Sequence, residues 1–133
     1  MKIEVSNGEI LDKHTILKIK LEQIKDPVKL VNIQREYDIL DQNVKMIFND
    51  CDHELALHEA YDELLAINRK LWKIEDDIRD CERERDFSLR FIQLARDVYY
   101  TNDDRNLAKK KIDSLTGSAL TEEKGYADYK NKQ

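Results

Sequence analysis

The chain has 133 residues, enough for one domain with a buried core and too few for two ordinary domains. Charged side chains make up 38% of it, whereas glycine occurs three times and proline once. This composition favours long solvated helices and disfavours a β-sandwich. The net charge of -5 comes from mixed signs without a basic face, so nucleic-acid binding is not favoured.

The N-terminal segment predicts a short extended stretch and then a helix. Residues 1–5 alternate apolar and charged side chains, as an extended segment does. Ser6 and Glu9 match a capping box, in which the Ser6 hydroxyl accepts from the Glu9 amide and the Glu9 carboxylate reaches back. The first helix ends at Asp26, because Pro27 cannot continue a helix but is well placed to start the next one. This tight connection predicts an antiparallel helical hairpin.

Two apolar stripes with alternating steps of three and four residues predict the next two helices. The first stripe runs from Leu30 to Ile47, and a polar break over 50–53 follows it. The second stripe runs from Leu57 to Cys81 along the longest predicted helix. We expect these two helices to supply the main packing seam, with Cys81 as a small buried hydrophobic residue.

Three further signals divide the C-terminal half. Asp86 is a candidate cap for another helix, and the alternative is that the long helix bends there and runs on. Thr101 and Asp104 match a second capping box, which predicts that a short helix begins at this point. Gly117 fits the left-handed residue that ends many helices.

These elements predict an all-α fold, an antiparallel bundle of four or five helices with one long central helix and a short extended N-terminal segment. The bundle forms a single domain over 1–117, and 118–133 is a polar tail that docks on the bundle or stays loose. No stretch approaches the roughly 20 apolar residues that span a bilayer, and the N-terminus lacks the apolar core of a signal peptide. We therefore expect a cytoplasmic protein without membrane contact. Cys51 and Cys81, two thiols without metal-ligand spacing, fit that compartment.

The densest cluster of unusual polar residues lies between positions 96 and 105. A helix that begins at Thr101 would present free backbone amides to a phosphate or carboxylate, and a neighbouring arginine would assist. One hypothesis is therefore a site for a small anionic ligand such as a nucleotide or sugar phosphate. Its residues would be Arg96, Tyr99, Thr101, Asn102, Asp104 and Arg105. The alternative is that the cluster only caps a helix, packs its tyrosines and pairs its arginines with nearby acids.

No metal ion or other cofactor is expected. The carboxylate pairs Glu59/Asp62 and Asp77/Asp80 resemble those that hold magnesium in all-helical nucleotide pyrophosphohydrolases. Both pairs fall on one predicted helix, however, about 27 Å apart at ~1.5 Å per residue. They cannot share a metal ion within one chain.

Trp72 lies beside the second apolar stripe and is a candidate anchor for a protein partner. Simple burial of Trp72 in the bundle is the alternative. Because no catalytic set is evident, the sequence favours a non-enzymatic protein-interaction factor. It would bind a partner, or a second copy as a homodimer, through the helix face near Trp72 or through the tail. The alternative function is a small-molecule-binding protein or enzyme that acts on an anionic ligand through Arg96–Arg105.

Five segments spread along the chain together resemble a known family. They are Ile3–Lys13, Leu71–Arg79, Val98–Arg105, Leu115–Ser118 and Glu122–Tyr129. The family consists of small uncharacterised proteins of bacteria and tailed phages and is classed as a domain of unknown function. The resemblance covers nearly the whole chain. It implies a standalone cytoplasmic protein of bacterial or phage origin and assigns no functional residues.

Overall fold

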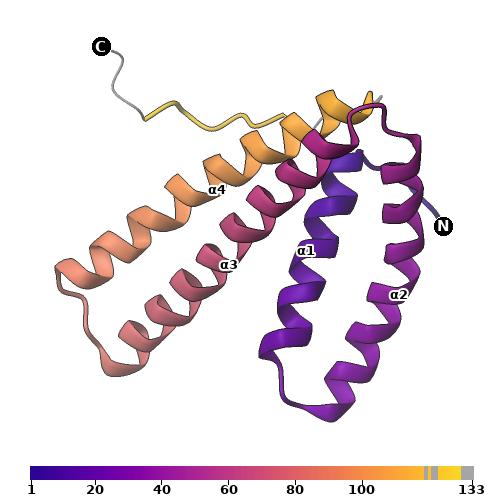
Figure 1. Cartoon of the computed structure of the whole chain (residues 1–133). Helices are drawn as coiled ribbons and strands as arrows, with labels where there is room; N and C mark the ends of the chain where they lie inside the picture. The colour runs from indigo at the N-terminus through magenta and orange to yellow at the C-terminus, as the bar shows by residue number, and fades with distance from the viewer. Residues whose placement is uncertain (119, 121–122, 130–133) are drawn as a thin grey trace.

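The computed structural model describes residues 1–118, 120 and 123–129, and all regular structure in this part of the chain is helical. Its helices are α1 (Asn7–Gln23), α2 (Pro27–Asp50), α3 (Glu54–Glu84) and α4 (Leu89–Thr116). The predicted all-α fold is therefore confirmed, with four helices in the described residues (Figure 1). None of these helices is long and apolar enough to cross a membrane.

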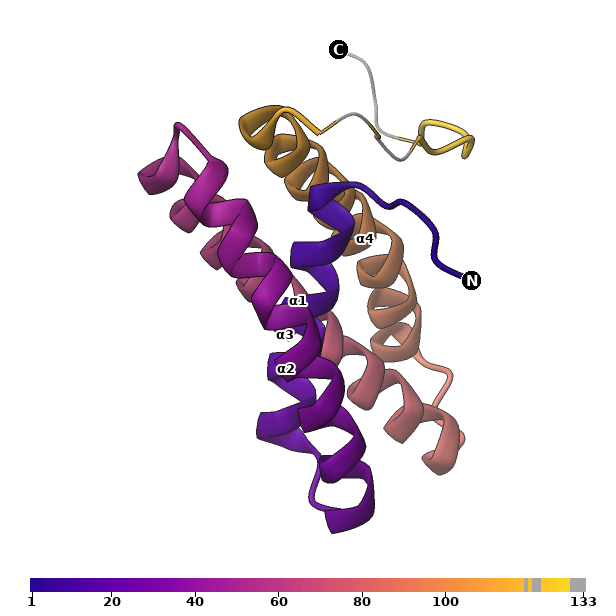
Figure 2. The same cartoon turned by 90° about the vertical axis from the view of Figure 1, so that its right-hand side faces the viewer.

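The helices pair into two hairpins that diverge from a common junction. α1 packs along α2 and α3 packs along α4, and Figure 1 shows the two hairpins together at the top of the view and apart at the bottom. α1 also contacts both α3 and α4, and it lies between α2 and α4 in Figure 2. The hairpins are therefore joined through α1.

The predicted seam between the second and third helices is wrong, since α2 makes few contacts with α3. The reason lies in α1, whose side chains Leu11, Leu17 and Ile19 are all at most 2% exposed. A helix that is apolar on more than one side is buried among several neighbours. α1 therefore lies where the apolar stripes of α2 and α3 were expected to meet, and it keeps these two helices apart.

The core lies at the junction of the hairpins and is built from leucine and isoleucine side chains of several helices. Its fully buried members are Leu11, Leu57, Leu64 and Ile112. Gly8 allows α1 to approach α4 closely, because a Cβ at this position would lie 2.4 Å from the Lys109 carbonyl oxygen. The Gly8 amide also donates to Asp113 Oδ1 at 2.7 Å. These contacts fix the start of α1 on the end of α4.

Most helix ends follow the predicted local signals. Ser6 accepts from the Glu9 amide at 3.1 Å, and Asp26 caps α2. Gly117 ends α4 in the left-handed conformation, with φ of 63°. The second half of the predicted capping box is not formed, since the Glu9 carboxylate lies 2.7 Å from Lys109 Nζ instead.

The third and fourth helices are separated by a tight reversal. α3 ends at Glu84 and is followed by its C-cap residue Arg85, which has a left-handed φ of 54°, and Ser88 occupies the N-cap position of α4. Asp86 accepts from the Ser88 amide at 3.1 Å, so it orders the turn two residues before the cap. The alternative in which the long helix runs on is therefore wrong.

The capping box predicted at Thr101 and Asp104 is also wrong, because both residues lie inside α4. Thr101 is 2% exposed and its side chain is packed in the helical assembly. The spacing of Thr101 and Asp104 is typical of a helix start. The helix nevertheless continues through these residues, because the inner side of α4 is buried against other helices. Tertiary packing overrides such local propensities.

A candidate binding cleft between the hairpins

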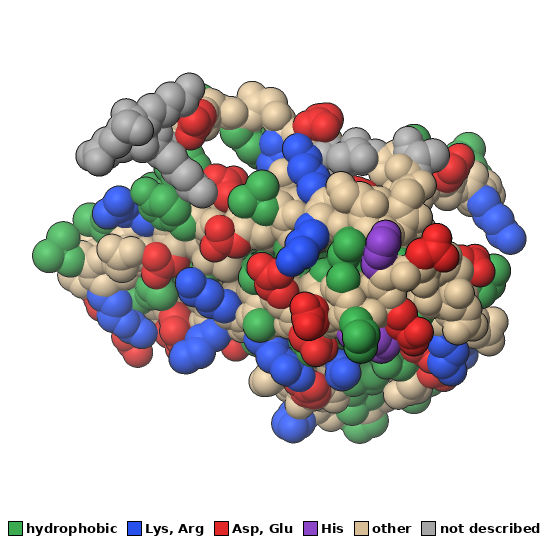
Figure 3. All heavy atoms as spheres, turned by 45° about the horizontal axis from the view of Figure 1, so that its top comes forward, with side chains coloured by type: hydrophobic (Ala, Val, Ile, Leu, Met, Phe, Trp, Pro, Cys, Tyr) green, Lys and Arg blue, Asp and Glu red, His purple; other side chains and the backbone are tan. Residues whose placement is uncertain are grey.

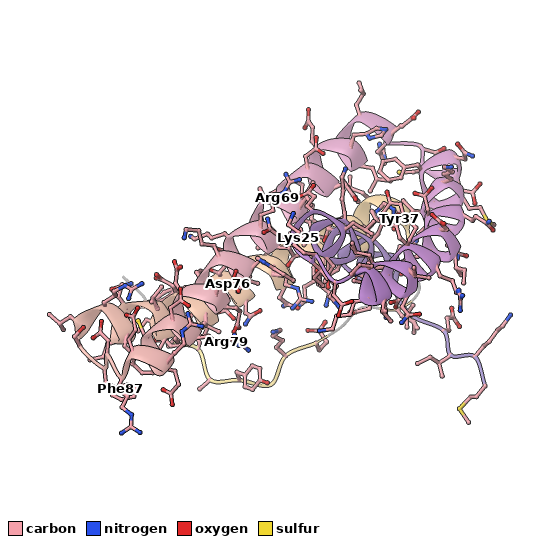
Figure 4. The ribbon with its side chains drawn as sticks, turned by 90° about the horizontal axis from the view of Figure 1, so that it is seen from below. Lys25, Tyr37, Arg69, Asp76, Arg79 and Phe87 are labelled. Atoms are coloured by element: carbon pink, nitrogen blue, oxygen red, sulfur yellow. The ribbon has the colours of Figure 1, made fainter. Side chains whose placement is uncertain are left out.

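A cleft of about 480 Å³ lies where the two hairpins diverge. Its volume falls in the range of roughly 300–1,000 Å³ that is usual for ligand pockets. Side chains of α1, α3 and α4 line it: Ile16, Ile19, Asn68, Leu71, Trp72, Glu75, Asp76, Arg79, Asn102 and Arg105. Figure 4 looks towards this divergence from below and shows Asp76 and Arg79 along α3. The cleft thus combines an apolar wall with several charged and amide groups.

A buried polar network supports the cleft. Asp12 of α1 is 2% exposed and accepts two hydrogen bonds from Arg105 of α4, from Nε at 2.9 Å and from Nη2 at 2.5 Å. Asn68 of α3 donates to Asp12 Oδ1 at 2.9 Å and to Thr15 Oγ1 at 2.7 Å. The hydroxyl of Thr15 donates in turn to the Asp12 carbonyl at 2.6 Å. This network joins three helices and offsets the cost of burying a carboxylate.

Most of the charges around the cleft are already compensated. Arg105 pairs with Asp12, and Arg79 pairs with Glu75 on the preceding turn of α3. Asp76 forms no ion pair with any described residue. The charged side chains of the lining, Glu75 and Asp76 against Arg79 and Arg105, balance each other, and the buried Asp12 adds one negative charge behind them. The region as a whole therefore favours a basic group over an acidic one.

Three of the residues singled out from the sequence meet at the cleft. Trp72 lines it from α3, and Asn102 and Arg105 line it from α4. Thr101 is buried, and Asp104 lines a different hollow on the other side of α4. Because α4 is continuous at these positions, it has no helix N-terminus that could bind an anion there.

The other two predicted ligand residues lie on the exposed face of α4. The guanidinium carbon of Arg96 stands 5.9 Å from the centre of the Tyr100 ring. Tyr99 packs at 5.3 Å from Tyr100 and at 5.0 Å from Tyr129 of the tail. An uninterrupted helix turns about 100° per residue, so it directs neighbouring residues to different faces. The six predicted residues therefore do not form one site.

Sequence reasoning missed Asp12, Asn68 and Asp76. A signal existed for Asn68, which stands four residues after Leu64 and three before Leu71, on the buried face of α3. A polar side chain at such a core position requires a buried partner. No comparable local signal identifies Asp12, because its partner Arg105 belongs to the last helix.

His14 forms a second buried polar group, where α1 meets α2 and α3. Nε2 lies 2.9 Å from Asp41 Oδ1, and Nδ1 lies 2.7 Å from the Tyr61 hydroxyl. Because a carboxylate can only accept, Nε2 carries the proton and Nδ1 accepts from Tyr61. Tyr37 stacks on the imidazole with a centroid separation of 4.6 Å. The imidazole thus makes one hydrogen bond to α2 and one to α3.

The surroundings of His14 keep the imidazole neutral. Burial is the largest influence and lowers its pKa below 6.5, although Asp41 opposes the change. Burial also acts on Asp41, but hydrogen bonds from His14 and Lys45 hold the pKa of its carboxyl below the ordinary value. Burial raises the pKa of Tyr61, which keeps its hydroxyl a donor. This group lies outside the cleft lining and ties three helices together.

The face of the molecule that includes the junction of the hairpins carries mixed charge. Acidic and basic side chains intermingle over the face seen in Figure 3. The described residues contain no group of three His, Cys, Asp or Glu side chains that could hold a metal ion. The arrangement offers a preformed cleft with Trp72 in its apolar wall.

The fold and cleft define a small all-helical protein with a preformed groove between two hairpins. The chain belongs to DUF6165, a family of unknown function whose model matches residues 1–131. The predicted membership of a family of unknown function that spans the chain is thereby confirmed. Neither the curated proteins nor the solved structures contain a match to this chain.

Proposed function

We propose that this protein is a non-enzymatic interaction factor that binds a segment of a partner protein in the cleft between the hairpins. The observation that carries the proposal is the position of Trp72, the single tryptophan of the chain, in the wall of an open cleft. Aromatic side chains that stay partly accessible in a preformed groove are common anchors of protein interfaces. The expected cytoplasmic location agrees with this role.

The charge and shape of the cleft favour one kind of partner segment. Ile16, Ile19 and Leu71 line the cleft together with Trp72, and this apolar part of the lining favours an apolar side chain of the partner. Asp76, which has no ion-pair partner among the described residues, favours a lysine or arginine beside it. The segment that fits is an amphipathic helix with an apolar and a basic residue three or four positions apart.

A second candidate rests on a different observation. Arg79, Arg105 and Asn102 line the same cleft from two helices and provide donors for a phosphate or carboxylate. The protein would then bind a small anionic ligand such as a nucleotide or sugar phosphate. We rank this candidate second, because Glu75 and Asp12 already engage the two guanidinium groups.

Affinity capture with matched variants tests the first proposal. Wild-type protein, Trp72→Ala and Asp76→Lys are compared with Asp62→Lys, which makes the same charge reversal on α3 outside the cleft. We expect a protein that wild type and Asp62→Lys both retain and that the two cleft variants lose. A peptide from that protein should change the emission of Trp72, which reports directly on the cleft.

The same fluorescence measurement separates the two candidates. A response of Trp72 to inorganic phosphate or ATP that Arg79→Ala abolishes would favour the anionic ligand. Retention of the same proteins by all four forms of the protein would contradict the partner-binding proposal.

A further inference from the structure

α4 carries a row of side chains on its exposed face, away from the cleft. The members of this outer row are Leu89, Ile92, Arg96, Tyr99, Tyr100, Asp103 and Leu107. Their spacing of mainly three and four residues places them along one side of the helix. The apolar members are unusually accessible, with Leu89 82%, Ile92 49% and Leu107 61% exposed. Exposed apolar side chains that gather on one face of a helix are typical of an interaction surface.

The outer row is complementary to itself when its direction is reversed. A second copy that runs in the opposite direction, with the two-fold axis between Tyr99 and Tyr100, brings Arg96 opposite Asp103 and Ile92 opposite Leu107. Two-fold symmetry produces each of these contacts twice. The pairing therefore joins opposite charges to each other and Ile92 to Leu107, whereas Leu89 falls at the level of Lys110. This order of charges favours a second copy of the chain as the occupant.

The tail of the same chain covers the centre of the outer row. The Tyr129 hydroxyl donates to Asp103 Oδ2 at 2.5 Å. Its ring packs edge-on against Tyr99 at 5.0 Å and against Tyr100 at 4.9 Å. Figure 1 shows the tail running beside α4. Tyr129 thus occupies the acceptor and the aromatic surface that a second copy would need.

We propose that the outer row is a self-association surface on which two copies pair through antiparallel α4 helices, and that Tyr129 masks it. The tail and the second copy compete for Asp103 and the two tyrosines. Release of the tail therefore switches the chain from monomer to dimer. The surface is separate from the cleft, whose α4 residues Asn102 and Arg105 lie on another face. Both surfaces can be occupied together.

The first test measures the mass of the full chain in solution as a function of concentration, by light scattering or sedimentation. Tyr129→Ala is compared with wild type and with Tyr126→Ala, a matched control at a tail residue that is 84% exposed. We expect Tyr129→Ala to lower the dissociation constant of the dimer by about tenfold or more. Tyr126→Ala should behave as wild type. A Tyr129→Ala protein that associates no better than wild type overturns the proposal.

Charge reversal then tests the antiparallel pairing. In the Tyr129→Ala chain, Arg96→Asp or Asp103→Arg alone places like charges opposite each other twice and should weaken the dimer by about tenfold or more. The two substitutions together exchange the charges and should restore it. Single reversals without effect, or a double reversal that fails to restore association, overturn the pairing. Circular dichroism confirms that each variant keeps its helices.

Discussion

Arg96 and Arg105 belong to the same helix, but they have different surroundings. Arg105 faces inward, where it makes two hydrogen bonds to a carboxylate that is 2% exposed. Arg96 faces outward, where its guanidinium stands over Tyr100. We call Asp12–Arg105 the inner pair; Arg96 and Asp103, which face each other only across the proposed dimer, are called the outer pair. On a continuous helix, the face that a residue occupies therefore determines its role more than its sequence neighbours do.

The largest effect is expected for the inner pair. Arg105→Ala removes the ion-pair partner of the buried Asp12 carboxylate. Within the polar network, Asn68 then remains as the side chain that donates to this carboxylate. Breaking a buried ion pair in this way costs about 3–5 kcal/mol, and urea unfolding measures that loss. Arg105→Lys keeps the charge without the two-pronged geometry and should lose less. A decrease of the free energy of unfolding by less than about 1 kcal/mol in Arg105→Ala would contradict the structural role of the inner pair.

Gly8 lies where the start of α1 packs closely against the inner face of α4 near its end. In Gly8→Ala the new methyl group would meet the Lys109 carbonyl, so α1 must shift and strain its hydrogen bond to Asp113. Overpacking of this kind costs about 1–3 kcal/mol and should lower the thermal midpoint by several degrees. Gly125→Ala is the matched control, because nothing lies within 4 Å of its Cβ position. Equal midpoints for the two variants would contradict the close approach.

The lowered pKa of His14 predicts that the free energy of unfolding depends on pH. The folded chain has a His14 pKa below 6.5, so the unfolded chain binds more protons as the pH falls below that value. The free energy of unfolding should therefore be highest above pH 6.5 and decrease below it, by at most about 1.4 kcal/mol per pH unit. The loss due to His14 ends once the folded imidazole also protonates.

Urea unfolding between pH 8 and pH 5 checks this dependence. His14→Gln should flatten the decrease below pH 6.5, whereas His58→Gln, at a side chain that is 59% exposed, should leave it unchanged. The same slope in His14→Gln and wild type would show that another group controls the pH dependence.

The smallest effect is expected for the outer arginine. Arg96→Ala removes an exposed side chain and should change the free energy of unfolding by less than about 0.5 kcal/mol. Thermal unfolding at a concentration where the protein is monomeric provides the measurement. A loss comparable to that of Arg105→Ala would mean that the outer face stabilises the monomer.

Local signals predicted the fold more fully than the site. Ser6, Asp26 and Gly117 act within a few residues, so their roles can be inferred from the sequence. Thr101 shows the limit of such signals, because packing buries it inside a helix that local polarity suggested would begin there. The cleft depends on contacts such as Asp12 with Asn68, which are distant in the chain. Helical periodicity indicates which faces are buried, but it does not specify which helices meet.

Two double-mutant cycles, measured by urea unfolding of the monomer, test whether the two faces of α4 differ in their contribution to stability. One uses Asp12→Ala and Arg105→Ala, and the other uses Arg96→Ala and Asp103→Ala. We predict a coupling energy of about 1.5–3 kcal/mol for the inner pair and less than about 0.3 kcal/mol for the outer pair. Similar coupling energies for the two pairs would contradict the division of α4 into an inner face that holds the fold and an outer face that is available for association.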